Sequence, residues 1–266
     1  MMNPVLVIAL NTFRESVRDK VLYNLLLFVL LLIAASLLVA ELSLNQEQIV
    51  IARMGLSAML FFGVLIAIFI GIGLVYKEID KRTVYTILAK PLCRYEFILG
   101  KFFGLSLTLL VNCSVMLVAL LAALSVLAYR RYANQAFGYI NFGVLPAGLL
   151  IYLELLMVVA IALLFSSFST PVLSTVFSVL FYIIGSLSQD LLVFARSIRL
   201  VPAKYLLIGL YYVLPNFSNF NYINIVAHDF HFVSGRKILF ATVYALLYIC
   251  MLLVLTSVVF QKRNFK

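Results

Sequence analysis

The sequence predicts an all-α membrane protein, built as a bundle of six transmembrane helices. Hydrophobic residues make up 65% of the chain and charged residues only 11%, and the mean hydropathy is +1.15. The apolar residues are gathered in six segments, each with the roughly 20 residues that a helix needs to cross the ~30 Å hydrocarbon layer. A soluble chain of 266 residues would instead carry charges at regular intervals along each helix.

The six predicted spans belong to a single domain that covers residues 1–266. Residues 25–40 and 241–260 are apolar on every face, whereas the strands of a membrane barrel alternate apolar and polar side chains. The spans are therefore helical. We expect them at residues 21–40, 54–76, 103–129, 144–167, 172–194 and 237–260.

The first twenty residues are predicted to form an interfacial helix that lies flat in the headgroup layer. At helical spacing, an apolar face can form opposite a face that holds Asn11, Arg14 and Arg18. A secretory signal peptide is not expected, because the charged residues follow the apolar run instead of preceding it. A frayed terminus is the alternative. The apolar face would contain Val5, Ile8, Ala9, Phe13 and Val17.

Lysine and arginine predict the orientation, because they are enriched on the cytoplasmic flanks of membrane helices. The richest loop lies between the second and third spans, and the C-terminal tail is also basic. We expect a multi-pass protein of the bacterial inner membrane with both termini in the cytoplasm. The formal charge of +10 then suits anionic lipid headgroups, and no nucleic acid partner is expected. The basic residues are Lys77, Lys81, Arg82, Lys90, Arg94 and Lys101 in the loop, and Lys262, Arg263 and Lys266 in the tail.

Neither metal binding nor a disulfide is expected. His228 and His231 are three residues apart with no further ligands nearby in the sequence. Cys93 is placed on the cytoplasmic side, and Cys113 and Cys250 lie inside predicted spans, away from an oxidising compartment.

The cytoplasmic segment at residues 77–102 is the most informative part of the sequence. A short helix is predicted over residues 79–89 and is bounded by Pro91. Its face with Val84, Ile87 and Leu88 can rest on the membrane-embedded part of the protein. The charges of the segment alone would be explained by the positive-inside rule, but the proline-bounded helix would not. We interpret it as a helix that transmits force from a partner.

The same segment resembles the first cytoplasmic loop of ABC-2 type transporter permeases. The likeness is greatest to the branch of the nitrous oxide reductase maturation and sodium-extrusion permeases. Arg82 departs from this pattern, because the family usually has glycine there. Residues 164–171 (LFSSFSTP) are similar to the short serine-rich connection between the family's fourth and fifth spans. The resemblance in the loop rests on Glu78, Thr83, Leu88, Pro91, Arg94, Gly100 and Lys101.

This resemblance implies a permease, as part of an exporter, that pairs with a second permease copy and with two copies of an ABC ATPase. The second permease copy would form a homodimer, or a heterodimer with a related permease. ATP and Mg would be bound by the ATPase, because Gly100 and Lys101 are followed by Phe102 and not by the hydroxyl residue of a nucleotide-binding loop. This chain is thus not expected to be an enzyme and needs no cofactor of its own. The implied coupling residues are Glu78, Asp80, Lys81, Arg82, Thr83, Tyr85, Leu88, Pro91 and Arg94, with Arg14 and Arg18 nearby.

A membrane scaffold is the alternative function. It would use the same kind of ATPase to help mature or assemble an extracytoplasmic enzyme or surface machine.

Residues 188–236 are predicted to be extracytoplasmic, with a re-entrant or interfacial segment at 205–214 that is too short to span. The stretch 216–224 (NFSNFNYIN) can contact a periplasmic partner or can simply form turns, which its composition favours equally.

Inside the bundle, Glu154 is the one acidic residue near the middle of a span, where a charge costs about 2.5–3.5 kcal/mol on insertion scales. It can line a substrate path with Asn112, or hydrogen-bond within the bundle to Asn112, Ser114 or Tyr182.

Small residues at four-residue spacing, Gly63, Ala67 and Gly71, predict close approach of another helix, either within the subunit or from a second copy. The sequence does not name a cargo.

Overall fold

The structure is a computed structural model, and all of its described secondary structure is helical. It describes residues 3–43, 46–80, 94–132, 141–188, 190, 193, 204–205, 207–209, 211, 214–229 and 234–262.

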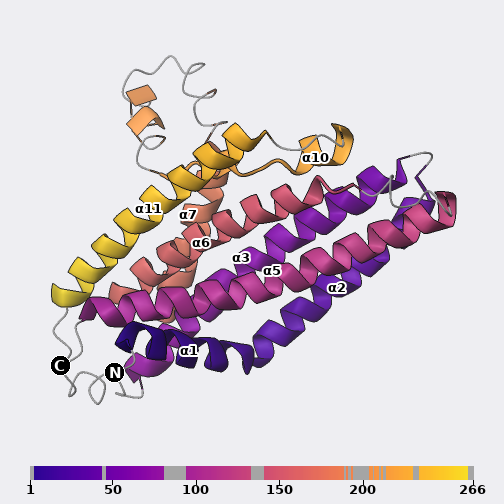
Figure 1. Ribbon diagram of the computed structural model, residues 1–266. Coiled ribbons are helices and arrows are strands. Elements are labelled where there is room, and N and C mark those ends of the chain that lie inside the picture. The colour runs from indigo at the N-terminus through magenta and orange to yellow at the C-terminus, as the bar shows by residue number, and fades with distance from the viewer. Residues whose placement is uncertain are drawn as a thin grey trace.

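The helices form one elongated bundle with α1 lying across one end (Figure 1). At this end, called the α1 end, α3 and α11 finish and α5 begins. At the opposite end, called the α10 end, α2 and α5 finish and α3 begins. The elements are α1 (Pro4–Val17), α2 (Lys20–Glu41), α3 (Glu47–Asp80), α5 (Arg94–Tyr132), α6 (Val144–Phe168), α7 (Pro171–Ser186), η2 (Phe217–Asn219), α10 (Ile223–Asp229) and α11 (Gly235–Lys262).

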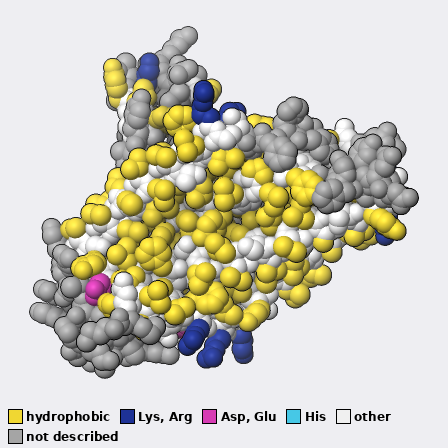
Figure 2. All heavy atoms as spheres, viewed as in Figure 1, with side chains coloured by type: hydrophobic (Ala, Val, Ile, Leu, Met, Phe, Trp, Pro, Cys, Tyr) yellow, Lys and Arg dark blue, Asp and Glu magenta, His cyan; other side chains and the backbone are white. Residues whose placement is uncertain are grey.

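Among the described residues, five helices are long and apolar enough to cross a membrane: α2, α3, α5, α6 and α11. Helix α7 lies in the predicted fifth span, 172–194, but has 16 residues, a rise of about 24 Å, which is less than the hydrocarbon thickness. The six-span count therefore stays a prediction. An apolar band covers the bundle between basic side chains near α1 and near the start of α11 (Figure 2).

Helices α3 and α5 are longer than the predicted spans 54–76 and 103–129. Residues 77–80 continue α3, and residues 94–102 are the first turns of α5. The segment expected to be a cytoplasmic loop is therefore helical at both of its ends, and its predicted internal helix, 79–89, lies largely outside the described residues.

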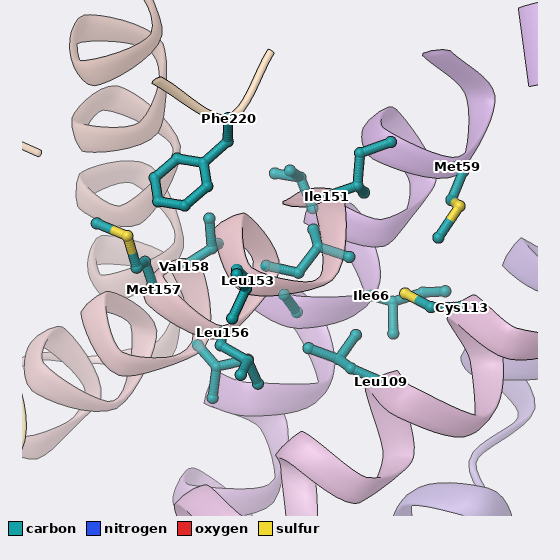
Figure 3. Packing of buried hydrophobic residues seen from close by; sticks show 14 of the residues in the cluster. Met59, Ile66, Leu109, Cys113, Ile151, Leu153, Leu156, Met157, Val158 and Phe220 are labelled. Atoms are coloured by element: carbon teal, nitrogen blue, oxygen red, sulfur yellow. The ribbon is translucent and has the colours of Figure 1, made fainter. Parts of the chain in front are cut away.

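Helix α6 is the centre of the bundle. It packs on α3, α5, α7 and α11, and 72% of its most apolar stretch is buried, against 22% for α2 and 28% for α11. Its residues are apolar on all sides, as is typical of a helix enclosed by others. Figure 3 shows its side chains Met157 and Val158 in one core with Phe220 and with Ile66 of α3.

The small-residue face of α3 packs on α6 within the subunit. A Cβ atom at Gly63 would lie 2.6 Å from Leu155 Cδ1, and one at Gly71 would lie 3.5 Å from the Cβ atom of Ala162. Ala67 between them is buried. Of the two interpretations of this face, the structure supports packing within one chain.

Two ion pairs join helices at the α10 end. Arg130 Nη1 of α5 lies 2.9 Å from Glu41 Oε1 of α2, and Arg131 pairs with Glu47 at the start of α3. Exposed pairs of this kind contribute only about 0–1 kcal/mol each, so packing, more than charge, holds these helices together.

Residues 214–229 form a segment that we call the plug. Its residues 217–220 pack on α7 and α11, and its helix α10 packs on α3 and α6. Asn216 Oδ1 accepts hydrogen bonds from Ser188 Oγ (2.8 Å) and from the Ser218 amide (3.1 Å), and the Asn216 amide donates to Tyr244 Oη (2.9 Å). Phe217 and Phe220 are buried. Asn216 thus joins its own turn to Ser188 and to α11, and these two aromatic rings are part of the core. The alternative of a periplasmic partner for the segment stays a prediction.

Gly185 of α7 allows the plug to sit close to the helix. A Cβ atom there would lie 2.6 Å from the Pro215 carbonyl oxygen and 2.7 Å from Phe217 Cδ2. We expect Gly185→Ala to lower the melting temperature, because backbone and a buried ring must move. Gly73→Ala is the control, since a Cβ atom at Gly73 meets nothing within 4 Å and alanine favours a helix by about 0.5–1 kcal/mol over glycine. Equal melting temperatures for the two variants would contradict the packing described.

Candidate functional site

Helix α1 is held against the first turns of α5 by two glycines. A Cβ atom at Gly100 would lie 2.7 Å from Ile8 Cβ, and one at Gly104 would lie 2.6 Å from the carbonyl oxygen of Ala9 and from Thr12 Cβ. Only glycine permits this approach of two helix backbones. We call the contact the α1–α5 seam.

The seam buries the middle of α1. Thr12 and Ser16 are fully buried, and Ser16 Oγ donates to the Thr12 carbonyl oxygen at 2.7 Å. The predicted polar residues Asn11, Arg14 and Arg18 are exposed, whereas Leu6, Val7 and Leu10 form a separate exposed apolar strip. The predicted helix is present, and the half-buried residues of its predicted apolar face, Val5, Ile8, Ala9, Phe13 and Val17, flank the buried pair.

The chain turns between α1 and α2 at a defined cap. Asp19 accepts a hydrogen bond from the Val21 amide at 3.0 Å and so begins α2. Arg14, Arg18 and Lys20 are exposed around this corner, where Figure 2 shows a group of basic side chains.

Lys101 follows Gly100 in α5 and is buried, with 1% of its surface exposed. Its Nζ atom lies 5.9 Å from the centre of the Phe97 ring, and Phe97 stacks on Phe260 of α11 at 5.8 Å. The Gly-Lys pair is therefore part of the packing that joins α5 to α1 and α11.

The predicted coupling residues are only partly described. Glu78 and Asp80 lie in the last turn of α3, and Arg94 begins α5, so the ends of the predicted segment emerge at the α1 end (Figure 1). The other predicted residues of this group, Lys81, Arg82, Thr83, Tyr85, Leu88 and Pro91, lie outside the described residues. The seam itself was not identified from the sequence, because the contact of Gly100 and Gly104 with α1 joins two distant segments.

Glu154 lies in α6 with 2% of its surface exposed. Tyr182 Oη of α7 donates to its Oε1 atom at 3.3 Å, and its Oε2 atom has no hydrogen-bond partner among the described residues. Of the three partners considered from the sequence, the structure selects Tyr182.

Asn112 and Ser114 bond to their own helix. Asn112 Nδ2 donates to the Thr108 carbonyl oxygen at 2.8 Å, and Ser114 Oγ donates to that of Leu110 at 2.7 Å. The placement of Asn112 in a substrate path stays a prediction without support from its contacts.

Within the described part of the chain, no three His, Cys, Asp or Glu residues come together as a metal site. Cys113 is buried and Cys250 exposed, and both are free thiols; Cys93 lies outside the described residues, as does His231.

A groove of about 370 Å³ runs between α3 and α7 beside Tyr182. Leu60, Phe61, Val64 and Ile183 provide apolar walls, and Ser57 and Asn221 provide polar groups. This groove was not predicted from the sequence, because its lining comes from three distant segments.

The close contact in the α1–α5 seam predicts that one methyl group added at Gly104 will push α1 away from α5. In Gly104→Ala, α1 must move away from α5, because the contact at 2.6 Å is with backbone. We expect spin labels on the exposed residues Leu6 and Phe103 to give a longer and broader distance distribution than in the parent. Gly71→Ala is the matched control, since its new methyl group would make ordinary contact at 3.5 Å. An unchanged distribution in Gly104→Ala would mean that the seam does not position α1.

The Glu154–Tyr182 contact predicts that the stability of the protein depends on the hydroxyl group of Tyr182. Tyr182→Phe removes the hydrogen bond from the hydroxyl group to the carboxyl group and should destabilise the protein by about 1–3 kcal/mol, measured by thermal unfolding in detergent. In a Glu154→Leu background the same change should cost much less, because no buried polar oxygen is left without its bond. An equal cost in both backgrounds would show that the two side chains do not interact.

Comparison with known protein families gives one match. A family model described as ABC-2 family transporter protein matches residues 6–265, which is nearly the whole chain. No curated protein matches the chain.

Proposed function

The chain belongs to the ABC-2 transporter family, and we propose that it is the permease subunit of an ABC exporter, driven by a separate ATPase. Members of this family are membrane components of transporters and generally work with an ABC ATPase. The observation that carries the proposal is the match over residues 6–265, together with five helices suited to spanning a membrane.

The α1 end faces the cytoplasm in this proposal. The exposed Arg14, Arg18 and Lys20 surround the α1–α2 corner, and the basic segment between α3 and α5 leaves the bundle at the same end. Positive side chains collect on the cytoplasmic flanks of membrane helices. Both termini are then cytoplasmic, and the protein is a multi-pass component of a bacterial inner membrane whose anionic lipids contact these groups.

The ATPase binds the segment between α3 and α5. Two ATPase copies bind ATP and Mg and close on each other, and this motion pushes Glu78–Arg94 of each permease copy. The seam joins α1 to the first turns of α5, so a push on the segment also moves α1 and, through the Asp19 corner, the base of α2. The second permease copy supplies the other half of the path, as a homodimer or with a related permease.

The coupling proposal predicts loss of ATPase binding in the triple variant Lys81→Ala, Arg82→Ala, Tyr85→Ala. Affinity purification of the tagged chain in mild detergent, followed by mass spectrometry and an ATPase assay, measures the effect. We expect at least a ~10-fold drop in copurified ATPase, since two charged side chains and one tyrosine are removed, with a loss of about 1 kcal/mol or more for each contact. Arg130→Ala is the control, because this exposed side chain lies at the other end of the bundle.

An undiminished ATPase yield in the triple variant would refute the assignment of these residues. An ATPase that copurifies with the parent chain together with an extracytoplasmic enzyme, without movement of any solute, would favour the scaffold function. A chain that is purified alone under several conditions would argue against any ATPase-driven function.

A further inference from the structure

The groove between α3 and α7 has the size and lining of a site for an amphiphile. Its volume of about 370 Å³ falls in the range of roughly 300–1,000 Å³ that is usual for small-molecule sites. One wall is apolar, with Phe61 and Ile183 exposed at its mouth. Ser57 and Asn221 give the groove polar groups, and Tyr182 also lines it.

Behind Tyr182 lies the carboxyl group of Glu154. Glu154 is 2% exposed, and among the described residues no lysine, arginine or histidine lies within ion-pair distance of it. One of its oxygens also lacks a hydrogen bond there. A buried carboxylate without a cation is costly, and a bound cation would offset that cost.

The direction of the hydrogen bond selects the chemistry of the ligand. Tyr182 Oη donates its single proton to Glu154, so its lone pairs remain able to accept a hydrogen bond. Donation to a carboxyl group strengthens such an acceptor. A ligand head that donates N–H and carries positive charge satisfies both the hydroxyl oxygen and the carboxylate behind it.

We infer that this groove binds an amphiphile with a primary ammonium group, whose apolar chain lies along Phe61, Val64 and Ile183. The ammonium group donates to Tyr182 Oη, and the Glu154 carboxylate balances its charge. The inference rests on the proposed permease function for its role as a cargo site, but the binding itself does not need the ATPase.

Thermal unfolding of the full chain in phosphatidylcholine nanodiscs tests the site, with octylammonium as the probe. Octylammonium should raise the melting temperature in a saturable manner. Glu154→Gln, which keeps the shape of the side chain, should weaken the apparent affinity ~10-fold or more, because the negative charge that balances the ammonium group is lost. Octanol and octyltrimethylammonium, which lack the charge and the N–H donor respectively, should bind more weakly than octylammonium to the parent chain.

Two further variants keep the test decisive. Ile183→Trp fills the mouth of the groove at a residue that is 46% exposed, so it should fold normally and lose the octylammonium response. Tyr152→Phe is the matched control, because its hydroxyl group bonds to Ser106 in a different part of the bundle, and it should respond as the parent does. Nanodiscs containing phosphatidylethanolamine show whether a lipid headgroup with the same ammonium chemistry competes for the site.

A parent-like octylammonium affinity in Glu154→Gln or in Ile183→Trp would overturn the inference, as would an equal response to octanol. Copurification of the ATPase distinguishes this failure from failure of the proposed function. An ATPase retained by variants that have lost octylammonium binding leaves the permease function intact, whereas its absence from the parent removes that function without touching the binding site.

Discussion

The close packing of α6 against its neighbours is the constraint on which the rest of the structure depends. In hydrocarbon, apolar helices gain little by leaving lipid for one another, so contact at short range must hold them together. Gly63 and Gly71 bring α3 onto α6, and Gly148 of α6 brings it onto Leu117 of α5, where a Cβ atom would lie 2.8 Å from Leu117 Cδ1. The remaining helices are arranged around this three-helix core, which explains why α2 and α11 are mostly exposed.

Much of the fold follows from the sequence because length and apolar character determine where a helix can span. The prediction of 144–167 matches α6 closely, since its apolar run ends at Ser166 and Pro171. Helices α3 and α5 extend beyond the predicted spans 54–76 and 103–129. Charged residues such as Lys77 and Lys101 suggest the end of a span, yet a helix can continue past the membrane when tertiary contacts support it, as Phe97 and Phe260 do for α5.

The candidate sites were predictable only in part, for a related reason. Glu154 stands out in the sequence because a charge inside a span is expensive, and its partner Tyr182 was one of three possibilities. The groove beside Tyr182 combines residues 57–68, 179–183 and 221–223, and no local pattern relates these segments. Gly104 likewise becomes informative only when Ala9 and Thr12 of α1 are seen beside it.

The short connection at Asp19 couples the motion of α5 to that of α2 through α1. Only two residues separate α1 from α2, so the two helices can move little relative to each other. The α1–α5 seam in turn holds α1 against α5. Helix α1 and the corner at Asp19 thus connect the first turns of α2 to the first turns of α5. The two helices also contact each other directly. Rotation of α5 about its own axis would carry α1 with it and displace the first turn of α2 sideways. A rotation of α5 would therefore change the tilt of α2.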